Sequence, residues 1–408
     1  MKTIIKNIKR LMGCYADAPV ILRGRDMASC GYLDDAYVVI DGGVVEAFGP
    51  MSGYKMQESG NYVIDASERY VMPAFCDSHT HIVYAGSREG EYEDRIAGMS
   101  YAQIAERGGG ILNSADRLHA STENELYRSA MRRVREMMRG GTGAVEIKSG
   151  YGLTLEDEMK MLRVATRIKE DAVIAVKRTF LGAHAFPRAF VSDRDGYVRL
   201  IVEEMIPAVA SEKLADYIDV FCDEGFFTVE QTRRILERGL EYGLTPKIHA
   251  NELAASGGVQ VGVECGALSV DHLEHVGPAE CEALRGSGTM ATLLPGAAFF
   301  LGMEYAPARR MIDEGLAVAL ASDYNPGSSP SGSMKFVLSL ASIKMRMTPV
   351  EAFNAATVNG AYAMGLSDTH GTITPGKRAN VIITRPMPSF AYLSYQYTED
   401  LIERVIFN

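Results

Sequence analysis

The chain has 408 residues, of which 47% are hydrophobic and 23% are charged, and its formal net charge is -10. These proportions exclude wholesale disorder and a repeat fibre. The negative net charge argues against a nucleic-acid surface. The one basic run, "MRRVREMMR", is typical of the basic face of a helix. With no apolar run near the roughly 18 residues of a membrane span and no apolar leader, we expect a cytoplasmic protein with a small-molecule substrate.

Short β-like runs occur at both ends of the chain. They include "AYVVIDGGVVEAFG", with Asp41-Gly42-Gly43 as a turn, and "RANVIIT" and "IERVIFN" near the C-terminus. We expect residues 1–72 and 369–408 to pair into one small β-sandwich-like domain.

Residues 73–368 alternate apolar strands with amphipathic helices, the pattern of βα units around a parallel sheet. Eight segments are predicted as strands: 71–81, 143–151, 176–184, 217–225, 245–252, 267–275, 288–296 and 317–327. Eight such strands close a (β/α)8 TIM barrel. Capping boxes predict helix starts at Thr122, Thr228 and Thr348.

Six cysteines are spread along the chain without a CxxC pair: Cys14, Cys30, Cys76, Cys222, Cys265 and Cys281. The spacing argues against a zinc knuckle or a disulfide scaffold and predicts free thiols in a reducing compartment. Cys76 lies among apolar residues, which favours buried packing over a role as nucleophile.

The first strand segment ends in "AFCDSHTHIVYAG", with His79 and His81 one residue apart. In an extended chain, residues i and i+2 point the same way, so both imidazoles can aim at one point. Taken alone, the pair fits one surface and one core histidine equally well. The hypothesis of a metal site therefore depends on further ligands.

Active sites of (β/α)8 barrels lie at the C-terminal ends of the strands. The polar residues found there are His79, His81, Tyr151, His184, His249, Glu252, His272 and Asp323. We expect His275 to support the site or the fold, and His119 and His370 to be solvent-exposed.

Four of these residues suit a metal: His79, His81, His249 and Asp323. Three nitrogens and one carboxylate fit Zn²⁺ or iron and leave a position for water, whose pKa a metal lowers from about 16 to about 7. A structural zinc site would be closed and usually rich in cysteine. Two-metal barrels of this kind use a lysine at the end of strand four, which "VFCDEG" lacks, and Lys148 on strand two is a poor bridge. We therefore predict one metal.

Several blocks, among them "DSHTHIVYAGSRE", "AERGGGI", "TFLGAHAFP", "HANE" and "SDYNPGSSP", resemble the amidohydrolase superfamily in order and over nearly the whole chain. Within it they resemble the imidazolonepropionase family. The resemblance implies metal-dependent hydrolysis of the cyclic amide of 4-imidazolone-5-propanoate to N-formimidoyl-L-glutamate, in histidine degradation. It also implies a homodimer, and it leaves zinc or iron open.

The resemblance also implies roles for particular residues. Glu252, His272 and Asp323 would be catalytic, and the substrate would be bound by Arg88, Tyr151, His184, Glu252, Asn325, Gly327 and Ser328. Arg88 suits a propanoate arm because its planar guanidinium pairs with a carboxylate. Glu252 would carry a proton to the leaving nitrogen or support His249. His272 would stabilise an oxyanion or orient the water, and Asp323 would share the role of base.

Some interpretations stay open. The Arg107–Gly110 loop in "ERGGGI" lacks the GK[ST] of a P-loop, so its glycines approach the substrate or make a tight turn. Tyr101 covers the pocket or packs as an ordinary aromatic. The alternative functions are an aminohydrolase of a purine- or pyrimidine-like ring, suggested by "HANE", and a non-catalytic barrel that serves as a scaffold.

Overall fold

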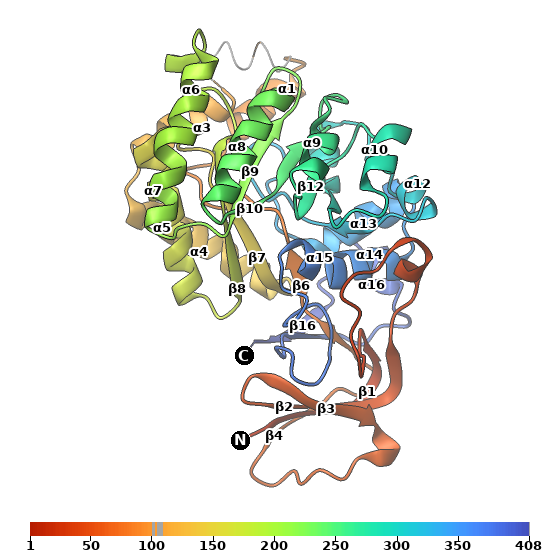
Figure 1. Cartoon of the computed structure of the whole chain (residues 1–408). Helices are drawn as coiled ribbons and strands as arrows, with labels where there is room; N and C mark the ends of the chain where they lie inside the picture. The colour runs from red at the N-terminus through yellow and green to blue at the C-terminus, as the bar shows by residue number, and fades with distance from the viewer. Residues whose placement is uncertain (100–102, 104–108, 408) are drawn as a thin grey trace.

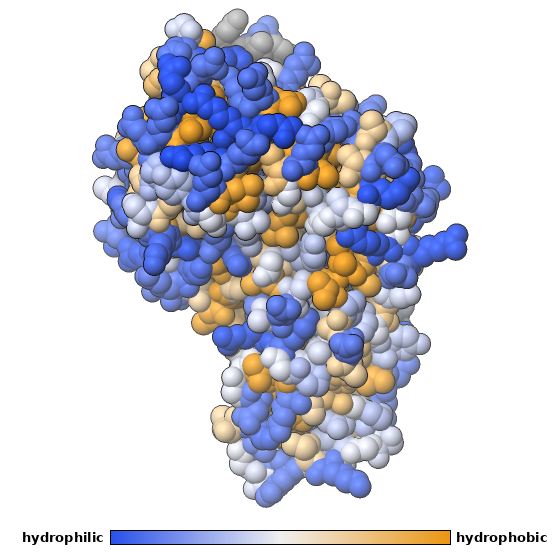
Figure 2. All heavy atoms as spheres, in the orientation of Figure 1, coloured by the Kyte–Doolittle hydropathy of each residue, from blue (hydrophilic) through white to orange (hydrophobic). Residues whose placement is uncertain are grey.

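The computed structural model describes residues 1–99, 103 and 109–407. Two sheets organise the chain, and Figure 1 shows the sheet with both termini beyond one end of the helix-covered barrel. Hydrophilic side chains cover most of the face seen in Figure 2. Among the described residues, no helix has the length and apolar character needed to cross a bilayer.

Strands from both ends of the chain form the seven-stranded sheet, in the order β16-β15-β5-β1-β2-β3 with β4 beside β1. The strands are β1 (Thr3–Met12), β2 (Tyr32–Asp41), β3 (Val44–Pro50), β4 (Tyr62–Asp65), β5 (Tyr70–Pro73), β15 (Val381–Thr384) and β16 (Ile402–Ile406). Gly42 and Gly43 both have positive φ and form the predicted tight turn between β2 and β3. The expected pairing of the two termini is confirmed.

The barrel consists of parallel strands in the order β6-β7-β8-β9-β11-β12-β13-β14, with the short β10 beside β9. Their bounds are β6 (Phe75–Asp77), β7 (Thr142–Lys148), β8 (Ala175–Ala183), β9 (Tyr217–Cys222), β10 (Thr245–Pro246), β11 (Ile248–Ala250), β12 (Ser269–His272), β13 (Met290–Leu293) and β14 (Val318–Leu320). Each of the eight predicted segments overlaps a barrel strand.

The ring closes just beyond β6 and β14. There a parallel bridge joins Thr80 to Tyr324, and the His81 N–H donates to the Tyr324 carbonyl at 2.9 Å. One predicted boundary was wrong: segment 71–81 is split, because Val71 to Pro73 belong to β5 of the terminal sheet. Val71 to Cys76 are all buried and apolar, so the hydrophobic pattern does not change where the sheets meet.

Helices surround the barrel (Figure 1). They are α1 (Glu89–Ile96), α3 (Ile111–His119), α4 (Glu123–Arg139), α5 (Leu155–Asp171), α6 (Arg194–Leu200), α7 (Ile206–Ser211), α8 (Val229–Glu241), α9 (Gly258–Glu264), α10 (Pro278–Leu284), α11 (Pro295–Leu301), α12 (Ala308–Asp313), α13 (Met334–Met345), α14 (Pro349–Ala356), α15 (Val358–Ala363) and α16 (Tyr392–Tyr395). The predicted capping boxes at Thr122, Thr228 and Thr348 are all present. A π-turn, Ile201–Met205, joins α6 to α7, and short 3-10 turns lie at Gly24–Ala28, Met51–Gly53 and Arg188–Phe190.

Candidate active site

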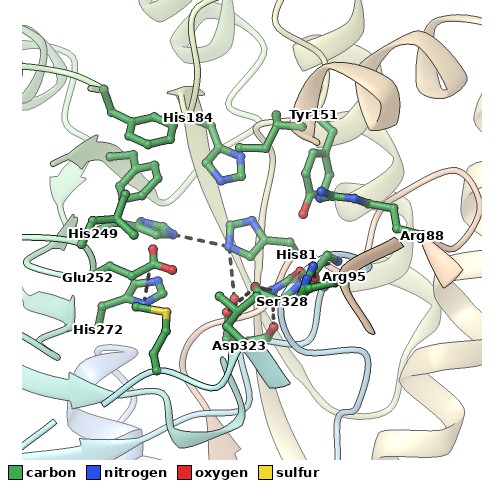
Figure 3. Close-up of a pocket in the computed structure, with 18 residues that line it drawn as sticks. His81, Arg88, Arg95, Tyr151, His184, His249, Glu252, His272, Asp323 and Ser328 are labelled. Carbon is green, nitrogen blue, oxygen red and sulfur yellow. Dashed lines mark hydrogen bonds and ion pairs between the residues drawn. The ribbon is translucent and has the colours of Figure 1, made fainter. Parts of the chain in front are cut away.

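A cavity of about 400 Å³ lies at the C-terminal ends of the barrel strands (Figure 3). Its lining includes His81, Arg88, Tyr151, His184, His249, Glu252, His272, Asp323, Asn325, Gly327 and Ser328. His79 is fully buried beside it. The barrel therefore brings the predicted site residues together.

Three imidazoles meet at one point. The Nε2 atom of His81 lies 3.2 Å from that of His79 and 3.4 Å from that of His249. One carboxylate oxygen of Asp323, Oδ1, lies 3.6 Å from the Nε2 atoms of both His79 and His81. The barrel closure places Asp323 here, because its N–H donates to the His79 carbonyl at 3.0 Å.

Hydrogen bonds to carboxylates set the tautomers of His79 and His249. His79 donates from Nδ1 to Asp271 at 2.6 Å, and His249 donates from Nδ1 to Asp219 at 3.0 Å. Burial lowers the pKa of both histidines well below 6.5, so they are neutral and their Nε2 lone pairs face the meeting point. Tetrahedral ligands about 2.1 Å from a metal stand about 3.4 Å apart. The residues present therefore fit a divalent metal ion.

Glu252 and His272 lie together across the cavity from Arg88 (Figure 3). The Nδ1 atom of His272 is 3.6 Å from Glu252 Oε2 and 3.7 Å from Glu274 Oε2. Burial opposes a charge on His272, but these two carboxylates outweigh it and raise its pKa to about 10. Burial raises the pKa of Glu252 to about 7, against the attraction of His272. A cation thus lies beside a proton acceptor that titrates near neutrality.

Backbone conformation at this wall is unusual, since His272 and Leu273 have φ values of 84° and 67°. Residues other than glycine adopt such angles only where the surrounding structure holds them, often at functional sites.

The loop that carries Glu252 is anchored by Asp223, a residue that we did not predict. The Asp223 carboxylate accepts the main-chain N–H groups of Glu252, Leu253 and Ala254 at 2.8 to 3.1 Å. Three N–H donors on one buried carboxylate fix the loop. The signal in the sequence was an acidic residue directly after the apolar strand "YIDVFC".

Arg88 provides a held cation at the opposite wall. It donates from Nε and Nη2 to Glu91 at 2.8 and 2.5 Å. Glu91 in turn accepts the Gly110 N–H at 3.0 Å and the Asn113 side chain at 3.2 Å. A Cβ on Gly327 would lie 2.2 Å from Arg88 Nη1, so glycine lets the guanidinium lie against this loop. Arg95, which we also did not predict, lines the same cavity.

Asn325 shapes the loop after Asp323. Its Oδ1 accepts the N–H groups of Gly327 and Ser328, both at 2.8 Å, and its Nδ2 donates to the Asp323 carbonyl at 2.7 Å. Ser328 donates from Oγ to Asp323 Oδ2 at 3.3 Å. The Asn325 side chain thus bonds its own loop and holds Gly327 and Ser328 at the cavity wall.

His184 and Tyr151 complete the cavity beside His81. The His184 ring stacks on that of His81 with centroids 5.1 Å apart, and its Nδ1 donates to the Gly150 carbonyl at 3.0 Å. Burial lowers the pKa of His184 to about 4, so this ring is neutral. Its Nε2 is thereby left as an acceptor.

An ionic layer beneath the imidazoles was missed. It comprises Glu146, Lys148, Asp219, Lys247 and Asp271, each at most 1% exposed. The opposing carboxylates outweigh burial and raise the pKa of Lys148, which therefore stays charged. The signal was a charged residue inside otherwise apolar strands, as in "AVEIK", "YIDVFC" and "SVDH".

His275 does not support the site with its side chain, which is exposed; its main-chain carbonyl accepts from Asn251. His119 is exposed as expected, but His370 is half-buried, and burial lowers its pKa to about 4.

Cys76 is buried, with its pKa raised by burial to about 12, which confirms the packing role. The cysteines are free thiols. Tyr101, Arg107 and Gly108 lie outside the described residues.

A closed parallel barrel with this ligand set is typical of metal-dependent hydrolases. Residues 70–401 match the amidohydrolase family, to which the chain belongs. The imidazolonepropionase of Flavobacterium johnsoniae is 52% identical over 406 residues, covering 100% of this chain and 98% of the relative. That of Flavobacterium psychrophilum is 51% identical over 405 residues, covering 99% and 98%. Within the amidohydrolases, the chain is a member of the imidazolonepropionase family.

Solved structures support the fold. Escherichia coli guanine deaminase superimposes with a TM-score of 0.71 at 14% sequence identity, covering 100% of this chain and 97% of that one. At this identity the likeness concerns the fold alone.

Proposed function

We propose that this chain hydrolyses the cyclic amide C–N bond of 4-imidazolone-5-propanoate and releases N-formimidoyl-L-glutamate, in histidine degradation. Full-length identity of 52% to a relative named imidazolonepropionase supports this substrate. The observation that carries the proposal is one cavity with the His79, His81, His249 and Asp323 cluster on one side and a held arginine on another. A substrate with a reactive ring and an anionic arm needs the cluster for the ring and the arginine for the arm.

The propanoate arm would pair with Arg88, whose guanidinium Glu91 holds at the cavity wall. This pairing fixes the ring carbonyl near the imidazole cluster, which lowers the entropy cost of reaction. A divalent metal held by His79, His81, His249 and Asp323 would lower the pKa of a water molecule and polarise that carbonyl.

The proton steps belong to Glu252 and His272. Glu252 would accept a proton from the attacking water and deliver it to the ring nitrogen as the C–N bond breaks. His272, positively charged at neutral pH, would stabilise the negative charge on the carbonyl oxygen. Asp323 would assist Glu252 as a proton acceptor.

Finer features of the proposal are one Zn²⁺ or iron per subunit, a homodimer, and action in the cytoplasm. Three imidazoles with one carboxylate suit both metals. Six free thiols fit a reducing compartment. We also propose that residues 73–368 act as the catalytic barrel and that residues 1–72 and 369–408 form a separate supporting domain.

The substrate can be tested directly. Protein loaded with Zn²⁺ or Fe²⁺ is mixed with 4-imidazolone-5-propanoate, ultraviolet absorbance is followed with and without a chelator, and the product is weighed by mass spectrometry. We expect loss of absorbance and a product heavier by one water molecule. Unchanged absorbance with fully metallated protein would contradict the proposal. Ammonia release from a purine or pyrimidine would favour an aminohydrolase instead.

A further inference from the structure

The barrel interior beneath the imidazole cluster is filled by charges. In (β/α)8 barrels the interior layers come from alternate strands and usually consist of branched apolar residues. Here the second, fourth and sixth strands around the barrel, β7, β9 and β12, contribute Lys148, Asp219 and Asp271, each at most 1% exposed. Replacing buried ion pairs by apolar residues is often neutral or stabilising, so stability alone does not explain such a layer.

Lys148 is the common partner within this layer. Its Nζ lies 2.6 Å from Asp219 Oδ2, 2.7 Å from Glu146 Oε1 and 3.4 Å from Asp271 Oδ2. The two aspartates are the residues that hold His249 and His79, at 3.0 and 2.6 Å. One ammonium group therefore lies within hydrogen-bond or ion-pair distance of both carboxylates that orient two of the three imidazoles.

We propose that Lys148 is a positioning residue for the metal site. By attracting Asp219 and Asp271, Lys148 keeps two like charges close together and holds each carboxylate in line with its imidazole Nδ1–H. The Nε2 atoms of His79 and His249 are thus set for a metal before it binds. Without Lys148 the two aspartates would repel each other and turn away from the rings.

Lys247 provides a matched control. It belongs to the same layer and is fully buried, but it donates to Glu146 and to the carbonyls of Ser78 and Ala363, at 3.0 and 3.3 Å for the carbonyls. Lys148→Met and Lys247→Met each remove one buried positive charge. They differ in direct contact. Lys148 Nζ lies within 3.4 Å of both aspartates behind the histidines, whereas Lys247 donates elsewhere and attracts the aspartates by its charge.

The test measures Zn²⁺ affinity of the full-length protein, by competition with a chromophoric chelator, and the melting temperature of the metal-free protein. We expect both variants to melt at lower temperature. We expect Lys148→Met to bind Zn²⁺ about 10- to 100-fold more weakly, as for other residues that orient metal ligands, while Lys247→Met stays within about threefold of the parent protein. Equal loss in both variants, or unchanged affinity in Lys148→Met, would overturn the proposal.

A second variant covers the case in which Lys148→Met does not fold. Lys148→Met with Glu146→Gln keeps the net charge of the layer and leaves both aspartates in place. We expect the loss of Zn²⁺ affinity to persist in this double variant; affinity equal to that of Glu146→Gln alone would overturn the proposal.

The inference rests on the proposed metal-dependent function, but the Zn²⁺ measurement uses no substrate. A parent protein that binds Zn²⁺ and leaves imidazolonepropanoate intact would refute the proposed substrate and not the role of Lys148. A parent protein that binds no Zn²⁺ or Fe²⁺ would overturn both.

Discussion

Asp323 has two functions in the structure, because its carboxylate faces the imidazole cluster while its N–H helps to close the barrel. Asp323→Asn keeps the main-chain bond and the side-chain size but loses the anionic ligand and proton acceptor. We expect turnover to fall by about 10³-fold or more, with an unchanged circular dichroism spectrum. Near-normal turnover in this variant would refute the assignment of Asp323 to the site.

The titration of Glu252 determines how we expect kcat/KM to depend on pH. Burial raises its pKa to about 7, so its carboxylate becomes protonated as the pH falls below neutrality and can no longer accept a proton. We expect kcat/KM of the metal-loaded protein to decline below about pH 7, and we expect this decline to disappear in Glu252→Gln, whose remaining activity is low throughout. The same decline in both proteins would assign the titration to another group.

Arg88 should affect binding more than chemistry. Losing a charge-assisted pair with a carboxylate costs about 1.5–3 kcal/mol, so Arg88→Met should raise KM about 10- to 100-fold and change kcat much less. Arg117→Met is the matched control, since Arg117 is exposed and donates to the nearby Ser87 carbonyl. A large fall in kcat at unchanged KM would contradict the role of Arg88.

The cluster residues were predictable because barrel topology converts position in the sequence into position in space. His79 and His81 follow the end of β6, Asp323 follows the end of β14, and His249 is the middle residue of the short β11. The ionic layer around Lys148 was not predicted, since its residues come from different strands and form ion pairs with one another. The sequence shows a charge in each strand but not which charges meet.

At the scale of single elements, the loop after β11 depends on one carboxylate. Asp223 accepts three N–H groups from the segment that holds Glu252. Asp223→Asn replaces the anion by an amide with a single acceptor oxygen, so we expect the loop to loosen and kcat to fall about 10- to 100-fold while the Zn²⁺ content stays unchanged. The Zn²⁺ content is measured on the same samples; loss of metal together with kcat would contradict this account.

Elements with local signals were predicted well. The helices after Thr122, Thr228 and Thr348 begin where side chain and main chain cap each other, which is a property of four consecutive residues. The division between β5 and β6 was not predicted, because only Ala74 separates the two strands, the residues on either side of it are buried and apolar, and the sheets differ only in partners that are distant in sequence.

At the scale of the whole molecule, barrel closure and the candidate metal site are the same feature. The bridge between Thr80 and Tyr324 joins the first and last barrel segments, and the candidate ligands His79, His81 and Asp323 flank it. A metal held there would tie the two ends of the barrel together. It would therefore add to stability as well as to activity.

The most direct measurement is a titration of the metal-free protein with Zn²⁺ or Fe²⁺, with turnover of 4-imidazolone-5-propanoate recorded at each addition. We expect turnover to rise linearly and to stop rising at one metal per chain. Full turnover before any metal is added, or a rise that continues to two metals per chain, would contradict a single-metal site built by His79, His81, His249 and Asp323.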